Sequence, residues 1–160
     1  MATGTIILPV PGNFDSTTPP AFSLFNSKPR MLFSDGADEI CHWTFRMPEN
    51  YASGLILKVQ YSMASDITNT VDLSVEVMAH ATSDTVAIDA DSYDTANTSN
   101  NNSVPATTAG KMGEISVTLT SADSVAAAEW CAIKFKRLSS TDDAVGNMEV
   151  VAASIEYTTS

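Results

Sequence analysis

The chain has few of the residues on which nucleic-acid binding, metal coordination and cross-linking depend. Its 160 residues include two histidines, two cysteines and eight lysines and arginines, against nineteen aspartates and glutamates. The net charge of −11 disfavours nucleic acid and anionic membranes, since both attract proteins through basic patches. The longest apolar run near the N-terminus, residues 6–10, is interrupted by Pro9 and is far too short to span a membrane. We therefore expect neither nucleic acid nor a membrane as a partner.

Two further absences concern secretion and covalent cross-links. The first basic residue is Lys28, so the apolar run lacks the charged segment that opens a secretory leader. In a chain made in a reducing cytoplasm, free thiols at Cys41 and Cys131 are the default expectation, and a cross-sheet disulfide is the alternative. A chain of this length buries enough surface to fold without a disulfide or a structural metal.

The sequence does contain long runs in which apolar and polar residues alternate. Leu57, Val59 and Tyr61 are separated by Lys58 and Gln60, and the same period of two recurs further along the chain. Since successive side chains of a strand point to opposite faces, this period indicates sheets with one buried face. We therefore predict an all-β fold, an antiparallel β-sandwich of the jelly-roll type with about eight strands. The predicted strands span residues 5–8, 31–34, 40–47, 55–62, 71–80, 112–120, 130–138 and 148–157.

The phase of the alternation predicts which side chains form the core. Cys41, Trp43 and Phe45 occupy alternate positions of one strand and are expected to face inward. Their predicted core partners are Leu57, Val75, Val117 and Phe135. Residues 148–157 change phase part-way along, and a β-bulge near residues 150–151 would reconcile the two halves.

Three segments depart from the alternation. Residues 1–28 contain four prolines and several large apolar side chains, which predicts an extended N-terminal arm ahead of a jelly-roll domain at 29–160. Residues 89–109 are almost entirely small and polar, which is typical of a long surface loop. Residues 121–127 begin with Ser-Ala-Asp, which favours one capped helical turn.

No constellation typical of catalysis is evident. His42 directly follows Cys41, so their side chains point to opposite faces of a strand and cannot form a dyad. His80 is expected to be an ordinary surface histidine at a strand end. We predict that the protein is not an enzyme and has neither a cofactor nor a small-molecule substrate. The alternatives for such a sandwich are a glycoside hydrolase with two converging carboxylates and a carbohydrate-binding module with exposed aromatic side chains.

The acidic residues offer one motif that could bind a cation. Asp89, Asp91 and Asp94 resemble a calcium-binding loop, but the turn glycine and the bidentate glutamate of such a loop are missing. A solvated acidic loop is therefore the simpler interpretation. A zinc site is disfavoured because Cys41 and Cys131 have no ligand-type spacing with a histidine pair.

Basic residues are concentrated in one predicted strand of this acidic protein. Lys134 and Lys136 share its outer face, and two interpretations remain open. Either the lysines pair across strands with Glu149 or Asp72, or they form a stripe of salt bridges between subunits.

Several segments carry a resemblance to a known family. Residues 43–55 read Trp-Thr-Phe-Arg-Met-Pro-x-x-Tyr-x-x-Gly-Leu, and alternating strands follow them. Together with Thr-Ala-Gly-Lys at 108–111, Asp-Ser-Val-Ala-Ala at 123–127 and Ile-Glu-Tyr at 155–157, this segment resembles small jelly-roll structural proteins of tailed bacteriophages. The resemblance covers roughly residues 40–157.

This resemblance implies a head decoration, or cement, protein that stabilises the capsid exterior by binding the major capsid protein. Such a virion protein would be synthesised in the host cytoplasm. We expect a homotrimer, because local three-fold axes are common attachment points and many weak contacts on a lattice act together. The alternative is a carbohydrate- or receptor-binding β-sandwich module of a phage tail appendage. The candidate capsid and subunit contacts are Ile6, Ile7, Leu8, Phe14, Lys134 and Lys136.

Overall fold

The regular structure of the chain consists of β-strands alone. The computed structural model describes residues 2–160, and these form eleven strands and no helix. None of the described segments is therefore a helix able to cross a membrane. The strands are β1 (Thr3–Leu8), β2 (Asn13–Phe14), β3 (Ala21–Phe25), β4 (Lys28–Phe33), β5 (Ile40–Arg46), β6 (Tyr51–Met63), β7 (Thr70–His80), β8 (Asn97–Ser103), β9 (Gly113–Thr118), β10 (Trp130–Arg137) and β11 (Met148–Thr159).

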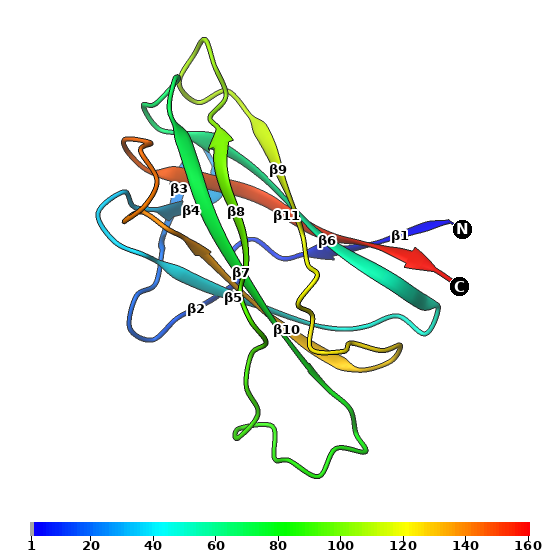
Figure 1. Cartoon of the computed structure of the whole chain (residues 1–160). Coiled ribbons are helices and arrows are strands. Elements are labelled where there is room, and N and C mark those ends of the chain that lie inside the picture. Colours follow the sequence, from blue (N-terminus) through cyan, green and yellow to red (C-terminus); the bar gives the residue numbers. More distant parts are fainter. Residues whose placement is uncertain (1) are drawn as a thin grey trace.

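Two antiparallel sheets pack against each other as the layers of a sandwich (Figure 1). The first has the order β3-β4-β11-β6-β9, with β1 also paired to β11, and the second has the order β2-β5-β10-β7-β8. The two termini lie side by side at one end, because Thr3 of β1 pairs with Thr158 of β11. The predicted jelly-roll β-sandwich is confirmed, although it has eleven strands rather than about eight.

The N-terminal residues are strands of the sandwich and not a separate arm. β1 pairs with β11 over six residues, β2 pairs with β5, and β3 forms a hairpin with β4. The prolines fall between these strands, at Pro9, Pro11, Pro19 and Pro20, where no ladder hydrogen bond is required of them. Residues 3–25 therefore contribute to both sheets, which corrects the expectation of an arm lying outside the domain.

Two other expectations are also corrected. The segment 89–109 is not wholly a loop, because β8 lies within it and pairs with β7 at the edge of the second sheet. The segment 121–127 forms turns in place of a helical turn. Asp123 and Ser124 there have φ angles of 52° and 53°, and this left-handed conformation is incompatible with an α-helix.

The core lies between the sheets and contains the predicted side chains. Trp43 and Phe135 are 1% and 0% exposed, and their ring centroids are 5.7 Å apart. The indole N–H of Trp43 donates a hydrogen bond to the carbonyl of Pro9 at 2.7 Å, which satisfies its one polar atom. Phe45 is only partly buried against this core. The predicted bulge is confirmed, since the register of β11 against β6 shifts between Val150 and Ala152.

Candidate functional site

A cleft of about 740 Å³ is lined by residues from the end of the sandwich where β1 begins and β11 ends, among them Thr3 and Thr158. Strands β6, β9 and β11 supply one wall, and the turns at residues 119–125 supply another. Asp94, from the loop that follows β7, completes the lining. The cleft therefore depends on segments that are far apart in the sequence.

Two tyrosines form the aromatic part of the cleft. Tyr51 begins β6 and Tyr157 lies near the end of β11, and their ring centroids are 6.0 Å apart with 48° between the planes. Tyr157 is 8% exposed, and its hydroxyl donates to Asn50 Oδ1 at 3.3 Å. Tyr51 is half-buried, and this burial raises the pKa of its hydroxyl above its ordinary value. The pair offers ring surface together with a hydroxyl donor.

A glycine makes room for one of these rings. Gly4 of β1 lies opposite Tyr157 of β11, and a Cβ atom at Gly4 would overlap the Tyr157 ring. Because Gly4 has no side chain, the Tyr157 ring can lie against the backbone of β1. Any larger residue at position 4 would displace Tyr157 and alter the cleft.

Two carboxylates also line the cleft. The Asp94 carboxylate accepts hydrogen bonds from the backbone N–H groups of Asp123 at 2.9 Å and Thr95 at 2.6 Å. These donors hold the pKa of Asp94 below its ordinary value. Glu156 forms an ion pair with Lys58 at 2.8 Å. Among the described lining residues there is no lysine, arginine or histidine, and most of the other polar side chains are hydroxyls.

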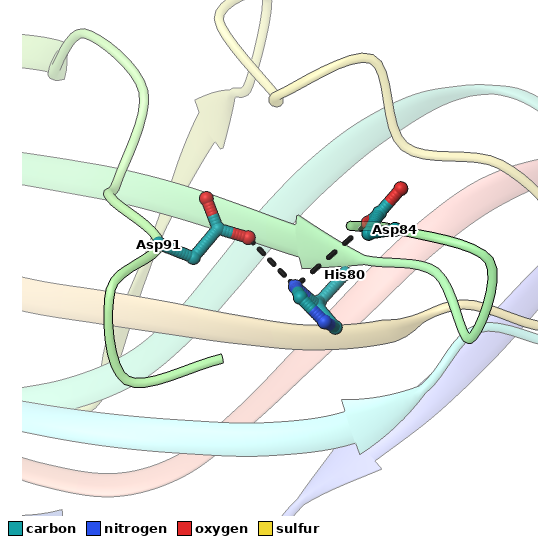
Figure 2. Close-up of side chains that lie close together, drawn as sticks. All are labelled: His80, Asp84 and Asp91. Atoms are coloured by element: carbon teal, nitrogen blue, oxygen red, sulfur yellow. Dashed lines mark hydrogen bonds and ion pairs between the residues drawn. The ribbon is translucent and has the colours of Figure 1, made fainter. Parts of the chain in front are cut away.

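A second cluster of polar side chains lies where β7 ends (Figure 2). His80 is the last residue of β7, and its Nδ1 is 2.8 Å from Asp91 Oδ2 and 3.8 Å from Asp84 Oδ2. The hydrogen bond to His80 is the largest of the effects that lower the pKa of Asp91. A cavity of about 330 Å³ beside the cluster is lined by Asp84, Asp91, Asp123 and Glu129. One imidazole and two carboxylates thus converge at the edge of an acidic cavity.

The sequence alone predicts no contact between His80 and the two aspartates. The sequence places Asp91 with Asp89 and Asp94 in an acidic loop, interpreted as solvated although it resembles a calcium loop, and it predicts an ordinary surface histidine at His80. The structure divides that acidic group, because Asp91 contacts His80 while Asp94 lines the terminal cleft. The spacing of His80 and Asp84, four residues apart, was a signal in the sequence. Nothing there indicated that Asp91 returns to the same point.

The predicted contact residues have different environments. Leu8 is 3% exposed and belongs to the core, and Ile6 is partly buried against the core. Ile7 and Phe14 are 77% and 41% exposed. The predicted partners of the lysines are corrected as follows: Lys134 pairs with Glu76 at 3.1 Å and Lys136 with Asp38 at 3.7 Å, while Glu149 pairs with Arg30.

The cysteines are both free and buried, as expected. Burial raises the pKa of both thiols, that of Cys131 to about 12, so neither is a thiolate at neutral pH. His42 contacts Tyr93 and Asp15, on the face of β5 opposite Cys41. The expectation that Cys41 and His42 form no dyad agrees with these positions.

Comparisons with known proteins bear on the fold alone. No family model and no curated protein matches the chain. The CBM35 module of Cellvibrio japonicus Abf62 is similar with a TM-score of 0.50 and 10% identity, over 98% of this chain and 99% of that one. An isomalto-dextranase of Arthrobacter globiformis T6 complexed with panose has a TM-score of 0.47 and 12% identity, over 96% of this chain and 23% of that one. The mannan-recognising module TmCBM27 has a TM-score of 0.43 and 11% identity, over 98% and 86%.

The similarity to the CBM35 module shows a shared jelly-roll fold. The CBM35 module is not a bacteriophage protein, so its similarity adds no support to the resemblance seen in the sequence.

Proposed function

We propose that the protein is a non-catalytic carbohydrate-binding β-sandwich module whose ligand occupies the terminal cleft. The observation that carries the proposal is the combination of Tyr51 and Tyr157 with hydroxyl and carboxylate groups in one cavity. Tyrosine offers an apolar ring face to the C–H groups of a sugar and a hydroxyl to its oxygens. The volume, about 740 Å³, lies within the roughly 300–1,000 Å³ typical of ligand pockets. The fold shared with a carbohydrate-binding module supports the same function.

The charge of the cleft restricts the class of saccharide. Asp94 and Glu156 are acidic, and no basic side chain lines the described part of the cleft, although Lys58 from outside it pairs with Glu156, so the negative charge rests mainly on Asp94. Carboxylates accept hydrogen bonds from sugar hydroxyls or from an ammonium group, but repel the carboxylate of a uronic acid. The ligand is therefore a neutral or an amino sugar.

The carboxylates also support a non-catalytic role. Glycoside hydrolysis requires one carboxylic acid that stays protonated near neutral pH, through a raised pKa, to donate a proton to the leaving group. Backbone N–H donors lower the pKa of Asp94, which is the opposite perturbation. Glu156 is engaged by Lys58. We infer that the cleft binds its saccharide and leaves it intact.

Titration calorimetry with three classes of oligosaccharide tests this proposal. We expect neutral manno-oligosaccharides or cationic chitosan oligomers to bind, and anionic galacturonate oligomers not to bind. Tyr51→Ala should weaken binding about tenfold or more, because it removes one ring and one hydroxyl. Thr118→Trp should also reduce binding, since it fills the cleft from an exposed position outside the core. Chromatography of the incubated saccharides should show no cleavage.

Phe25→Ala is the matched control for these variants. Phe25 is 59% exposed on β3 and does not line the cleft, so its loss should leave the affinity unchanged. Binding that survives in both Tyr51→Ala and Thr118→Trp, or that disappears in Phe25→Ala, would place the ligand elsewhere. The absence of binding by all three saccharide classes at millimolar concentration would contradict the proposal.

We also propose a second function, the decoration of a bacteriophage capsid by a homotrimer bound to the major capsid protein. The observation that favours it is the surface of β3, an edge strand on which Phe22, Leu24 and Phe25 are 45%, 66% and 59% exposed. Apolar side chains grouped on one edge strand are typical of a protein contact. In this proposal the protein lies on the exterior of the virion.

A further inference from the structure

We propose that His80, Asp84 and Asp91 form a binding site for a divalent transition-metal ion such as Zn²⁺. The three donor atoms are His80 Nδ1 and one carboxylate oxygen from each aspartate, and all lie within 4.8 Å of one another. Figure 2 shows both carboxylates directed toward the same ring nitrogen. None of these three residues lines the terminal cleft, although Ser124 lines both that cleft and the cavity beside the cluster. The proposal does not rest on the function proposed for the cleft.

The arrangement leaves a charge that a cation would balance. A ring nitrogen carries at most one proton, so His80 Nδ1 can donate to only one of its two carboxylate neighbours. Asp91, at 2.8 Å, accepts that proton, and Asp84, at 3.8 Å, is left facing the same atom without a donor from the ring. A divalent ion placed between the three donors interacts favourably with both carboxylates at once.

Backbone N–H groups orient both aspartates, through the second oxygen of Asp91 and through the ligand oxygen itself of Asp84. Asp91 Oδ1 accepts from the backbone N–H of Ser92 at 2.9 Å, which leaves Oδ2 directed at His80. Asp84 Oδ2 accepts from the backbone N–H of Ala81 at 2.7 Å, and its other lone pair is available for a metal. His80 itself is fixed by its place in the ladder between β7 and β10. The ligands are therefore positioned by backbone contacts before an ion arrives.

The adjacent cavity gives the ion access and a favourable potential. Its walls include Asp84 and Asp91 themselves, together with the carboxylates of Asp123 and Glu129. The latter two accept backbone N–H groups, from Ala79 at 2.9 Å and Ala126 at 2.7 Å. Four carboxylates around one cavity attract cations, and the cavity has room for the water that completes a coordination sphere with three protein ligands.

The donor set indicates the kind of metal. An imidazole nitrogen with two carboxylate oxygens suits Zn²⁺, Ni²⁺ or Mn²⁺, whereas Ca²⁺ prefers six to eight oxygen ligands and no nitrogen. No thiolate takes part, since both cysteines are buried in the core. We therefore expect Zn²⁺ to bind with a higher affinity than Ca²⁺.

Because the chain has only two histidines, ring NMR signals report directly on the site. Protein labelled in its histidine rings is titrated with ZnCl₂, and the two rings are assigned with His80→Gln and His42→Gln. We expect the His80 signals to shift and saturate at one equivalent, and the His42 signals to stay unchanged. EDTA should reverse the shift, and Ca²⁺ at the same concentration should not cause it.

Variants of the three proposed ligands distinguish a defined Zn²⁺ site from general binding of Zn²⁺ to an acidic surface. Asp91→Asn and Asp84→Asn should each lower the Zn²⁺ affinity about tenfold or more, and His80→Gln should remove the one-equivalent site. His42→Gln is the matched control, because His42 also faces a carboxylate, Asp15 at 3.4 Å, but only one. The exposed Asp84 can be changed with little risk to folding, and a melting curve of each variant verifies this.

Three results would overturn the proposal. The first is no saturating shift of the His80 ring up to millimolar Zn²⁺, and the second is an equal response of both rings. The third is an unchanged affinity in Asp84→Asn and Asp91→Asn, which would mean that the ion binds through other acidic groups. An equal response to Ca²⁺ and Zn²⁺ would refute the assigned class of metal.

Discussion

Arg137 shows how a single residue is accommodated in the interior of this sandwich. Its side chain is 0% exposed, and its guanidinium forms an ion pair with Asp142 through Nε at 2.7 Å and Nη2 at 3.1 Å. Its other hydrogen bonds run to the carbonyls of Phe33, Gly146 and Ala144 at 3.1, 2.7 and 2.6 Å. The charge therefore ties the end of β10 to β4 and to the segment that precedes β11.

Arg137→Met should lower the free energy of unfolding by roughly 3–5 kcal/mol, because it leaves a buried carboxylate and three carbonyls without their donor. Urea denaturation followed by tryptophan fluorescence measures the loss. Arg46→Met is the control: Arg46 pairs with Glu49 on the surface, with side chains 62% and 74% exposed, and little change is expected. The double variant Arg137→Met with Asp142→Asn should recover part of the stability. A loss below about 1 kcal/mol would contradict this account of Arg137.

At the scale of the element, β1 provides a test of register. Ile7 and Leu8 are adjacent in the sequence, but Ile7 is 77% exposed and Leu8 is 3% exposed. Leu8→Ala should therefore lower the free energy of unfolding by roughly 2–5 kcal/mol, whereas Ile7→Ala should change it by less than about 0.5 kcal/mol. Thermal melting of the two variants measures the difference. Similar melting temperatures would show that β1 is not held against β11 in this register, and would restore the interpretation of a free arm.

Strands with alternating apolar residues could be predicted from the sequence to within a few residues. The predicted 40–47, 71–80 and 130–138 correspond to β5, β7 and β10, and the bulge in β11 was located by its change of phase. β8 could not be found in this way, because its sequence, Asn-Thr-Ser-Asn-Asn-Asn-Ser, contains no apolar residue. Backbone pairing with β7 and the side-chain amides of Asn97 and Asn102, which donate to β7 carbonyls, define this strand.

The candidate sites were harder to predict than the strands, for a related physical reason. The alternation of apolar and polar residues shows which face of a strand is buried, but it does not show which loops contact each other at the ends of the strand. Tyr51 and Tyr157 approach each other because β6 and β11 are paired, and this pairing could not be read from either strand alone. Asp91 reaches His80 through a loop whose composition indicated only that it is polar.

At the scale of the whole molecule, one loop connects the two candidate sites. Residues 81–96 leave β7 at His80, supply Asp91 to the histidine cluster and then Asp94 to the terminal cleft. Between them, Tyr93 contacts His42 of β5 at 3.1 Å. The segment from 91 to 94 thus makes contacts at three positions in the second sheet and its turns, and it supplies a residue to each of the two proposed sites.

The exposed apolar side chains of β3 form the surface through which the proposed homotrimer would assemble. If the protein is a homotrimer, light scattering coupled to gel filtration should give three times the mass of one chain at micromolar concentration. Leu24→Ser combined with Phe25→Ser should then yield monomers, because it removes the two most exposed apolar side chains of β3. Val145→Ser is the control, since Val145 is 61% exposed but lies outside that strand. A wild-type monomer, or a trimer that persists in the β3 variant, would contradict assembly through this edge.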